Sequence, residues 1–180
     1  IADTNNNRVI TADLSGSVPL IIGTGAAGLR DGPFNTAQFD RPHGLALKSN
    51  SLYIADTGNQ CIRRANLNTR TVETLLRAPS HIKKLLPAGI PPARPSPWDL
   101  AIDKNILYIA MAGLHQIWSV DLSTMDVTLC AGSGREGCTD GPPAEASFAQ
   151  PSGICTDGKR LYVADSESSS IRCIDTAGDG

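Results

Sequence analysis

Three aspartates, Asp3, Asp56 and Asp165, occupy the same position of a recurring ten-residue motif. Carboxylates repeated at the ends of strands could form a ring that binds a cation. The alternative is structural, because an Asp before a turn accepts hydrogen bonds from backbone N–H groups of that turn. The turn residues that follow Asp56 favour the structural role. We therefore expect Asp56→Ala to cost about 1–2 kcal/mol of stability through lost turn hydrogen bonds.

The three histidines, His43, His81 and His115, do not recur at one position of the motif. A zinc site needs three or four ligands that converge on one point, and this pattern does not predict one. The sequence also lacks the nucleophile-elbow, zinc-protease and Walker patterns. It therefore predicts no cofactor, no metal, no catalytic residue and no enzymatic activity in this chain.

Two glycine-rich runs, 23–28 and 132–137, match the G-x-G-x-x-G pattern of dinucleotide-binding proteins. That site needs a helix N-terminus directed at the phosphates, whereas each run continues into Asp-Gly-Pro. The pattern is therefore interpreted as a loop between repeated units.

The five cysteines are odd in number and show no C-x-x-C spacing. We expect buried or half-buried free thiols that behave as small apolar side chains, and a disulfide between Cys130 and Cys138 stays open as an alternative.

A net charge of −2 makes nucleic acid an unlikely partner. The longest apolar runs are too short to span a membrane.

The motif itself sets the elements that carry these residues. Its four copies begin at Ile1, Ile54, Ile109 and Val163, which are 53, 55 and 54 residues apart. A second motif begins at Pro42, Pro97 and Pro151, in each case 12 residues before a copy. Such a period indicates a repeat architecture. Within each repeat, four short apolar runs separated by turn residues predict a four-stranded antiparallel sheet.

We therefore predict an all-β fold, a partial β-propeller with four-stranded blades and a repeat of about 54 residues. The expected organisation is a partial blade at 1–23, whole blades at 42–76 and 97–130, and a partial blade at 151–180. We expect the chain to be a piece of a longer protein. Because its outer blades lack neighbours, we expect the isolated chain to aggregate or to complete itself by association.

Alternating strand directions place the turn between the second and third strands at the same end as the connection between blades. This loop-rich end carries the candidate binding residues, which are Arg41, His43, Trp98 and His115. Lys83 and Lys84 join them from the irregular stretch 77–96. Long loops on a rigid scaffold are frequent binding sites. Core packing of Trp98 and a solvated insertion at 77–96 are the structural alternatives.

The sequence I-A-D-T followed by N and I-R, with P-x-G-[LI] ahead of it, resembles the NHL repeat. The stretches 96–99, 110–118, 147–153 and 164–172 are similar to a branch of the NHL family that joins a thioredoxin-like domain to a six-bladed propeller. This resemblance implies a non-catalytic protein-interaction platform whose partners are another protein and the rest of its own propeller. The alternatives are a metal-dependent propeller lyase or hydrolase and an RNA-binding domain. The resemblance implies a location in the cytoplasm or the chloroplast lumen, and the sequence does not decide between them.

Overall fold

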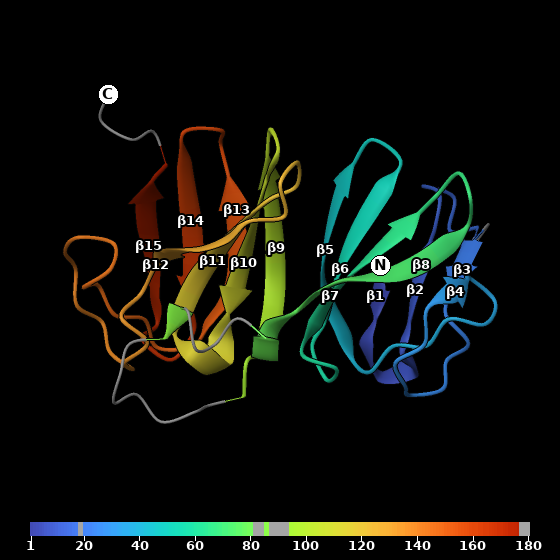
Figure 1. Cartoon of the computed structure of the whole chain (residues 1–180), viewed down its shortest axis with the longest axis horizontal. Coiled ribbons are helices and arrows are strands. Elements are labelled where there is room, and N and C mark those ends of the chain that lie inside the picture. Colours follow the sequence, from blue (N-terminus) through green and yellow to red (C-terminus); the bar gives the residue numbers. More distant parts are fainter. Residues whose placement is uncertain (18–19, 81–84, 87–93, 177–180) are drawn as a thin grey trace. The chain divides into compact units, whose positions relative to one another are not determined.

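The computed structural model describes residues 1–17, 20–80, 85–86 and 94–176. These residues form four antiparallel sheets with short 3-10 helices between some strands (Figure 1). The chain divides into two compact units, Ile1–Arg77 and Ala78–Gly180, and each unit holds two sheets. No helix in the described ranges is long and apolar enough to cross a membrane. The predicted all-β class with antiparallel sheets is confirmed.

Unit 1 contains a three-stranded sheet in the order β1-β2-β3 and a five-stranded sheet in the order β4-β8-β7-β6-β5. Its elements are β1 (Ala2–Asp3), η1 (Thr4–Asn6), β2 (Arg8–Thr11), β3 (Leu20–Ile22), β4 (Gly32–Pro33), β5 (Pro42–Lys48), β6 (Ser51–Asp56), β7 (Cys61–Asn66) and β8 (Thr71–Arg77). Strands β5 to β8 form the predicted meander, and the short β4 adds to the outer edge of β8.

Unit 2 contains a four-stranded sheet in the order β12-β11-β10-β9 and a three-stranded sheet in the order β13-β14-β15. Its elements are η2 (Ala78–Ser80), β9 (Pro97–Asp103), β10 (Ile106–Met111), η3 (Ala112–Leu114), β11 (Gln116–Asp121), β12 (Val127–Ala131), β13 (Pro151–Thr156), β14 (Arg160–Asp165) and β15 (Ser170–Asp175). Within this sheet of three, β15 forms an edge.

Each unit has its own apolar core between its two sheets. In unit 1, Val9 and Ile22 of the first sheet meet Ile54 and Val72 of the second, with Phe39 of the intervening loop among them. The core of unit 2 combines members of its two sheets with loop residue Phe148, and it includes Tyr108, Ile117, Ile154 and Val163. Strands alternate their side chains between faces, so one face of each sheet supplies these residues.

The turn after the second strand has the same shape in all four copies of the motif. Its last residue adopts a left-handed conformation, at Asn7, Gln60, His115 and Ser169, with φ between 50° and 56°. In the second copy Gln60, and not Gly58, has the positive φ. Gly58 is required for a different reason, since a Cβ there would lie 2.3 Å from the carboxylate of Asp40.

Candidate functional site

A buried ion pair joins the strands of unit 1 to the loop that precedes them. Asp56, at the end of β6, and Arg63, in β7, both have 0% exposed side chains. Arg63 Nη1 donates to Asp56 Oδ2 at 2.7 Å. Asp56 Oδ1 accepts the backbone N–H of Asp40 at 2.8 Å, and Asn59 Nδ2 donates to Oδ2 at 2.9 Å. The carboxylate therefore bonds to the incoming loop, to the next strand and to the Asn59 side chain of its own turn.

Arg63 extends this contact across the loop. Its Nη2 donates to the Arg30 carbonyl and to the Asp31 carboxylate, each at 2.8 Å, and its Nη1 also donates to the Gln38 carbonyl. The guanidinium lies over the Phe39 ring, 5.0 Å from its centroid, in a cation–π contact. We call the Asp56–Arg63 pair with these loop partners the clasp of unit 1.

Burial in the clasp shifts the pKa of Asp56 and of the neighbouring Cys61. Burial raises the pKa of the Asp56 carboxyl, and hydrogen bonds from Asn59, Asp40 and Arg63 oppose this shift. Burial and the nearby Asp56 charge raise the pKa of the Cys61 thiol to about 12. Because the thiolate is the reactive form, Cys61 remains an inert buried side chain at neutral pH.

Unit 2 contains a second clasp between β14 and β15. Asp165 Oδ1 accepts the backbone N–H of Ala149 at 2.7 Å. Arg172 donates to the Ser147 carbonyl at 2.9 Å and to the Asp140 carboxylate at 2.6 Å. Its guanidinium lies 5.2 Å from the centroid of the Phe148 ring. Arg172 Nη1 lies 3.6 Å from Asp165 Oδ2. The corresponding distance in unit 1, from Arg63 Nη1 to Asp56 Oδ2, is 2.7 Å.

The motif copy in β10 and β11 builds the same connection without charge. Met111 and Trp118 occupy the positions of the acid and the base, and both are fully buried. Trp118 Nε1 donates to Gln116 Oε1 at 2.8 Å. The amide nitrogen of Gln116 donates to the carbonyls of Leu85 and Gly132. The loops are thus held by a tryptophan and an amide where unit 1 uses the ion pair.

In the first copy of the motif, Asp3 has different partners. Arg8 Nε donates to Asp3 Oδ2 at 2.7 Å and Asn6 Nδ2 donates to Oδ1 at 2.7 Å. The bond from Arg8, followed by that from Asn6, lowers the pKa of the Asp3 carboxyl.

Within the described residues, no group of three or more His, Cys, Asp or Glu side chains could hold a metal ion.

The predicted binding residues are divided between the two units. Arg41 and His43 lie in unit 1, whereas Trp98 and His115 lie in unit 2. Arg41 is exposed, Trp98 is 38% exposed, and His43 and His115 are partly buried. Burial, followed by the Arg41 charge, lowers the pKa of His43. Lys83 and Lys84 lie outside the described residues.

His115 has a structural contact that the sequence did not reveal. Its Nδ1 accepts the backbone N–H of Gln150 at 3.3 Å. In unit 1 the Oδ1 atom of Asn7, the matching motif residue, accepts the backbone N–H of Arg41 at 2.9 Å. We call this contact between consecutive sheets the latch. Gln150 and Arg41 both precede the first proline of a strand and both have positive φ.

The glycine-rich runs lie in loops between sheets, as interpreted from the sequence, and no helix follows either of them in the described residues. A Cβ at Gly132 would lie 2.5 Å from the carbonyl oxygen of His115, so close backbone approach explains that glycine. All five cysteines fall within the described ranges and all are free, which removes the Cys130–Cys138 alternative. The expectation of buried or half-buried thiols is wrong for Cys138, Cys155 and Cys173, which are exposed.

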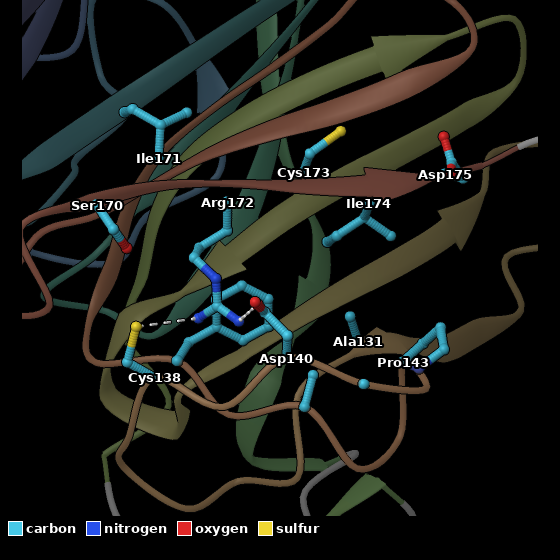
Figure 2. Close-up of a pocket in the computed structure, with 13 residues that line it drawn as sticks. Ala131, Cys138, Asp140, Pro143, Ser170, Ile171, Arg172, Cys173, Ile174 and Asp175 are labelled. Carbon is cyan, nitrogen blue, oxygen red and sulfur yellow. Dashed lines mark hydrogen bonds and ion pairs between the residues drawn. The ribbon is translucent and has the colours of Figure 1, made fainter.

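A groove of about 690 Å³ lies beside β15. Figure 2 shows Arg172 pointing from the strand toward Asp140 on the facing loop, with Cys138 beside the guanidinium. Ile174, Ala131 and Pro143 supply apolar lining. The sequence analysis did not single out this groove. The signal available was the last motif copy, which supplies only three of four expected strands.

Comparison with known proteins agrees with the repeat pattern. The NHL repeat family matches residues 39–64 and 148–174. NHL repeat-containing protein 2 of Gallus gallus is 35% identical over 97% of this chain, which spans 28% of that protein. Protein SUPPRESSOR OF QUENCHING 1, chloroplastic, of Arabidopsis thaliana is 40% identical over 96% of this chain, which spans 18% of that protein. Neither name states an enzymatic activity.

Similar solved structures support the fold, and at their low sequence identity they support nothing beyond it. A chain in a crystal structure of a nidogen/laminin complex has a TM-score of 0.64 and 17% identity, covering 98% of this chain and 54% of that one. An auxiliary nutrient binding protein from Bacteroides thetaiotaomicron has a TM-score of 0.65 and 18% identity. The match covers 94% of this chain and 43% of that one. With its repeated antiparallel sheets, this chain has the fold of a partial β-propeller, matches the NHL repeat at residues 39–64 and 148–174, and is similar along nearly its whole length to NHL repeat-containing protein 2.

Proposed function

We propose that this chain is a non-catalytic part of a propeller, and that it serves as a rigid platform for a protein partner in a larger thioredoxin-like and NHL protein. The observation that carries this proposal is that buried side chains hold the loops at the loop-rich ends in place. Buried groups fix the loops there: Asp56 and Arg63 in unit 1, Gln116 and Trp118 in unit 2. A partner that meets such loops loses little conformational freedom on binding, which favours affinity.

The exposed chemistry of these ends suits protein recognition. Trp98 is the second residue of β9 and is 38% exposed, and Arg41 is exposed beside Asp40 in unit 1. Tryptophan and arginine are enriched among the residues that dominate protein–protein affinity. The most strongly bonded carboxylates and the thiol of Cys61 are instead used inside the clasps, where they do not face a substrate.

Site-specific photo-crosslinking in the full-length protein tests the platform. A photoreactive residue replaces Trp98 at the loop-rich end of unit 2 or, in the matched control, Met125 in the turn between β11 and β12 at the opposite end. Both native side chains are 38% exposed. We expect a discrete protein adduct from position 98 and none from position 125. Equal adducts at both positions, or none at either, would contradict the proposal.

A further inference from the structure

We infer that the latch formed by His115 is a pH-sensitive device of unit 2, closed while the imidazole is neutral and opened when the ring takes up a proton. The inference goes beyond the proposed function, and the latch itself does not depend on that function. Its foundation is an internal comparison. Unit 1 builds the same latch with Asn7, whose side-chain amide does not titrate.

The turn that presents the latch side chain is the same in both units. Asn7 and His115 are each the seventh residue of a motif copy, and each has positive φ. Each also donates its backbone N–H to the carbonyl three residues earlier, that of Thr4 at 3.1 Å or that of Ala112 at 3.2 Å. Backbone bonds therefore hold this turn, and its shape does not depend on the charge of the side chain.

The donor on the facing sheet is matched as well. Arg41 and Gln150 directly precede the prolines that begin β5 and β13, and both have positive φ. In each unit the N–H of the residue before this donor is held by the clasp aspartate. Two successive N–H groups thus have separate acceptors. The clasp holds the first from its own sheet, and the latch holds the second from the neighbouring sheet.

Only the neutral imidazole can serve as the acceptor in unit 2. Nδ1 of His115 accepts the N–H of Gln150 at 3.3 Å, which places the ring proton of the closed latch on Nε2. A histidinium donates from both ring nitrogens, so a proton on Nδ1 would face the N–H of Gln150 with no lone pair between them. His115 is only partly buried, so solvent can deliver this proton.

The elements around the latch carry charges of both signs. Their carboxylates already have donors: Asp165 holds the N–H of Ala149, Asp99 of β9 holds that of Ile154 at 3.0 Å, and Glu167 accepts from the side-chain amide of Gln150. Protonation of His115 therefore removes the latch bond without taking the place of these donors. The other charged residues of the described segments beside the turn and of β9 are Arg94, Asp103, Arg135 and Glu136.

The direction of the pH effect follows from the acceptor. The latch is closed above the range in which histidines ordinarily titrate, around pH 6.5, and it opens as the pH falls through that range. Opening is local, because the bonds from Ala149 to Asp165 and from Ile154 to Asp99 remain. Unit 1 keeps its latch. A partner on the loop-rich end of unit 2 would then meet a less pre-organised surface, and only this consequence rests on the proposed function.

Hydrogen exchange of two amides in the full-length protein tests the inference. Mass spectrometry with residue-level fragmentation follows the N–H groups of Gln150 and Arg41 at pH 7.5 and pH 5.5, and each rate is divided by the intrinsic exchange rate at that pH. We expect the protection of Gln150 to fall about tenfold between the two conditions, because proton binding competes with the latch bond. The protection of Arg41, which Asn7 holds, should not change.

Exchanging the latch residues between the units provides the matched control. His115→Asn gives unit 2 the acceptor of unit 1, so Gln150 should stay protected at both pH values. Asn7→His gives unit 1 the acceptor of unit 2, and the protection of Arg41 should then depend on pH. An equal loss at both amides in the parent, or an undiminished loss at Gln150 in His115→Asn, would overturn the inference, because acid would then loosen the protein by another route.

The parent protein alone decides if a variant fails to fold. Protection of Gln150 that is the same at both pH values overturns the inference without any variant. The two proposals also remain separable. A pH-sensitive amide at Gln150 with no crosslink at position 98 rejects only the platform, and a pH-insensitive amide with a retained crosslink rejects only the pH-sensitive latch.

Discussion

At the scale of single residues, the position of Arg63 explains more than any other side chain in unit 1. Its two terminal nitrogens make four hydrogen bonds, to a carboxylate in β6, to another in the preceding loop and to two loop carbonyls. A planar guanidinium suits such a set of acceptors, which a lysine ammonium would not match. The remaining nitrogen, Nε, is buried without a hydrogen-bond partner among the described residues, so the clasp is held chiefly by the two terminal nitrogens.

Replacing Asp56 tests how the clasp contributes to stability. Asp56→Ala leaves Arg63 buried without its principal partner, and removing one member of a buried pair costs about 3–5 kcal/mol. This exceeds the cost expected from turn hydrogen bonds alone. We expect the double variant Asp56→Ala, Arg63→Met to lose less than the sum of the two single variants, because no charge is then left alone.

Urea unfolding of the parent, both single variants and the double variant gives the coupling energy. The apolar pair Met111 and Trp118 already shows that this position of the motif folds without the charges. A cost of only about 1–2 kcal/mol for Asp56→Ala, with additive effects in the double variant, would restore the simpler explanation of lost turn bonds.

At the scale of elements, the latch fixes the spacing of consecutive sheets within a unit. His115 in unit 2 and Asn7 in unit 1 accept the same kind of backbone N–H. We predict that His115→Ala lowers the free energy of unfolding by about 1–3 kcal/mol, since the N–H of Gln150 loses its partner. His115→Asn should recover most of this loss, because the amide oxygen of Asn7 performs that role in unit 1.

Thermal or urea unfolding of the two variants measures this difference. Asn also tolerates the left-handed backbone that His115 adopts, so His115→Asn adds no backbone strain at this position. Equal loss in both variants would show that the imidazole ring contributes by packing and not by accepting the bond.

Local patterns in the sequence were sufficient to place the strands. Strand β6 extends over Ser51–Asp56, where β-branched and aromatic residues lie between turn residues, which is the pattern that predicts a strand. The acceptors of Arg63 could not be predicted in the same way. Three of them, in the segment that precedes β5, lie 25 to 33 residues away, and nothing local to Arg63 specifies such a partner.

The candidate site was predictable only in part for the same reason. The repeat placed Arg41, His43, Trp98 and His115 near strand ends, but the latch that employs His115 depends on a backbone N–H 35 residues away. The groove beside β15 became visible only when the two clasps were compared in three dimensions. Its polar residue Asp140 follows a glycine-rich run that the sequence indicates only as a loop between repeated units.

At the scale of the whole chain, stability depends on pH through groups whose pKa differs between the folded and unfolded states. The pKa of His43 is lowered from 6.5 by burial and then by Arg41. The pKa of Asp157 is lowered from 3.8 by backbone hydrogen bonds from Lys159 and Arg160. Asp56 acts in the opposite direction, because burial raises its pKa.

The sign of each contribution follows from which state binds the proton more readily. Below pH 6.5 the unfolded chain takes up a proton at residue 43 before the folded chain does, so stability declines from that pH downward. Asp157 contributes stability that is complete above pH 3.8 and is lost as the pH falls below that value. We therefore predict two separate declines as the solution is acidified.

Difference measurements isolate the two contributions from every other titrating group. Urea midpoints from pH 7.5 to pH 3 are compared for the parent, His43→Gln and Asp157→Asn. We expect His43→Gln to remove part of the decline that begins near the ordinary histidine pKa of about 6.5 and to leave the acid decline intact. Asp157→Asn should reduce only the decline at the acid end, since its carboxylate is the acceptor for the turn N–H groups. A parent-minus-His43→Gln difference that is flat from pH 7.5 to pH 5 would contradict the burial of neutral His43.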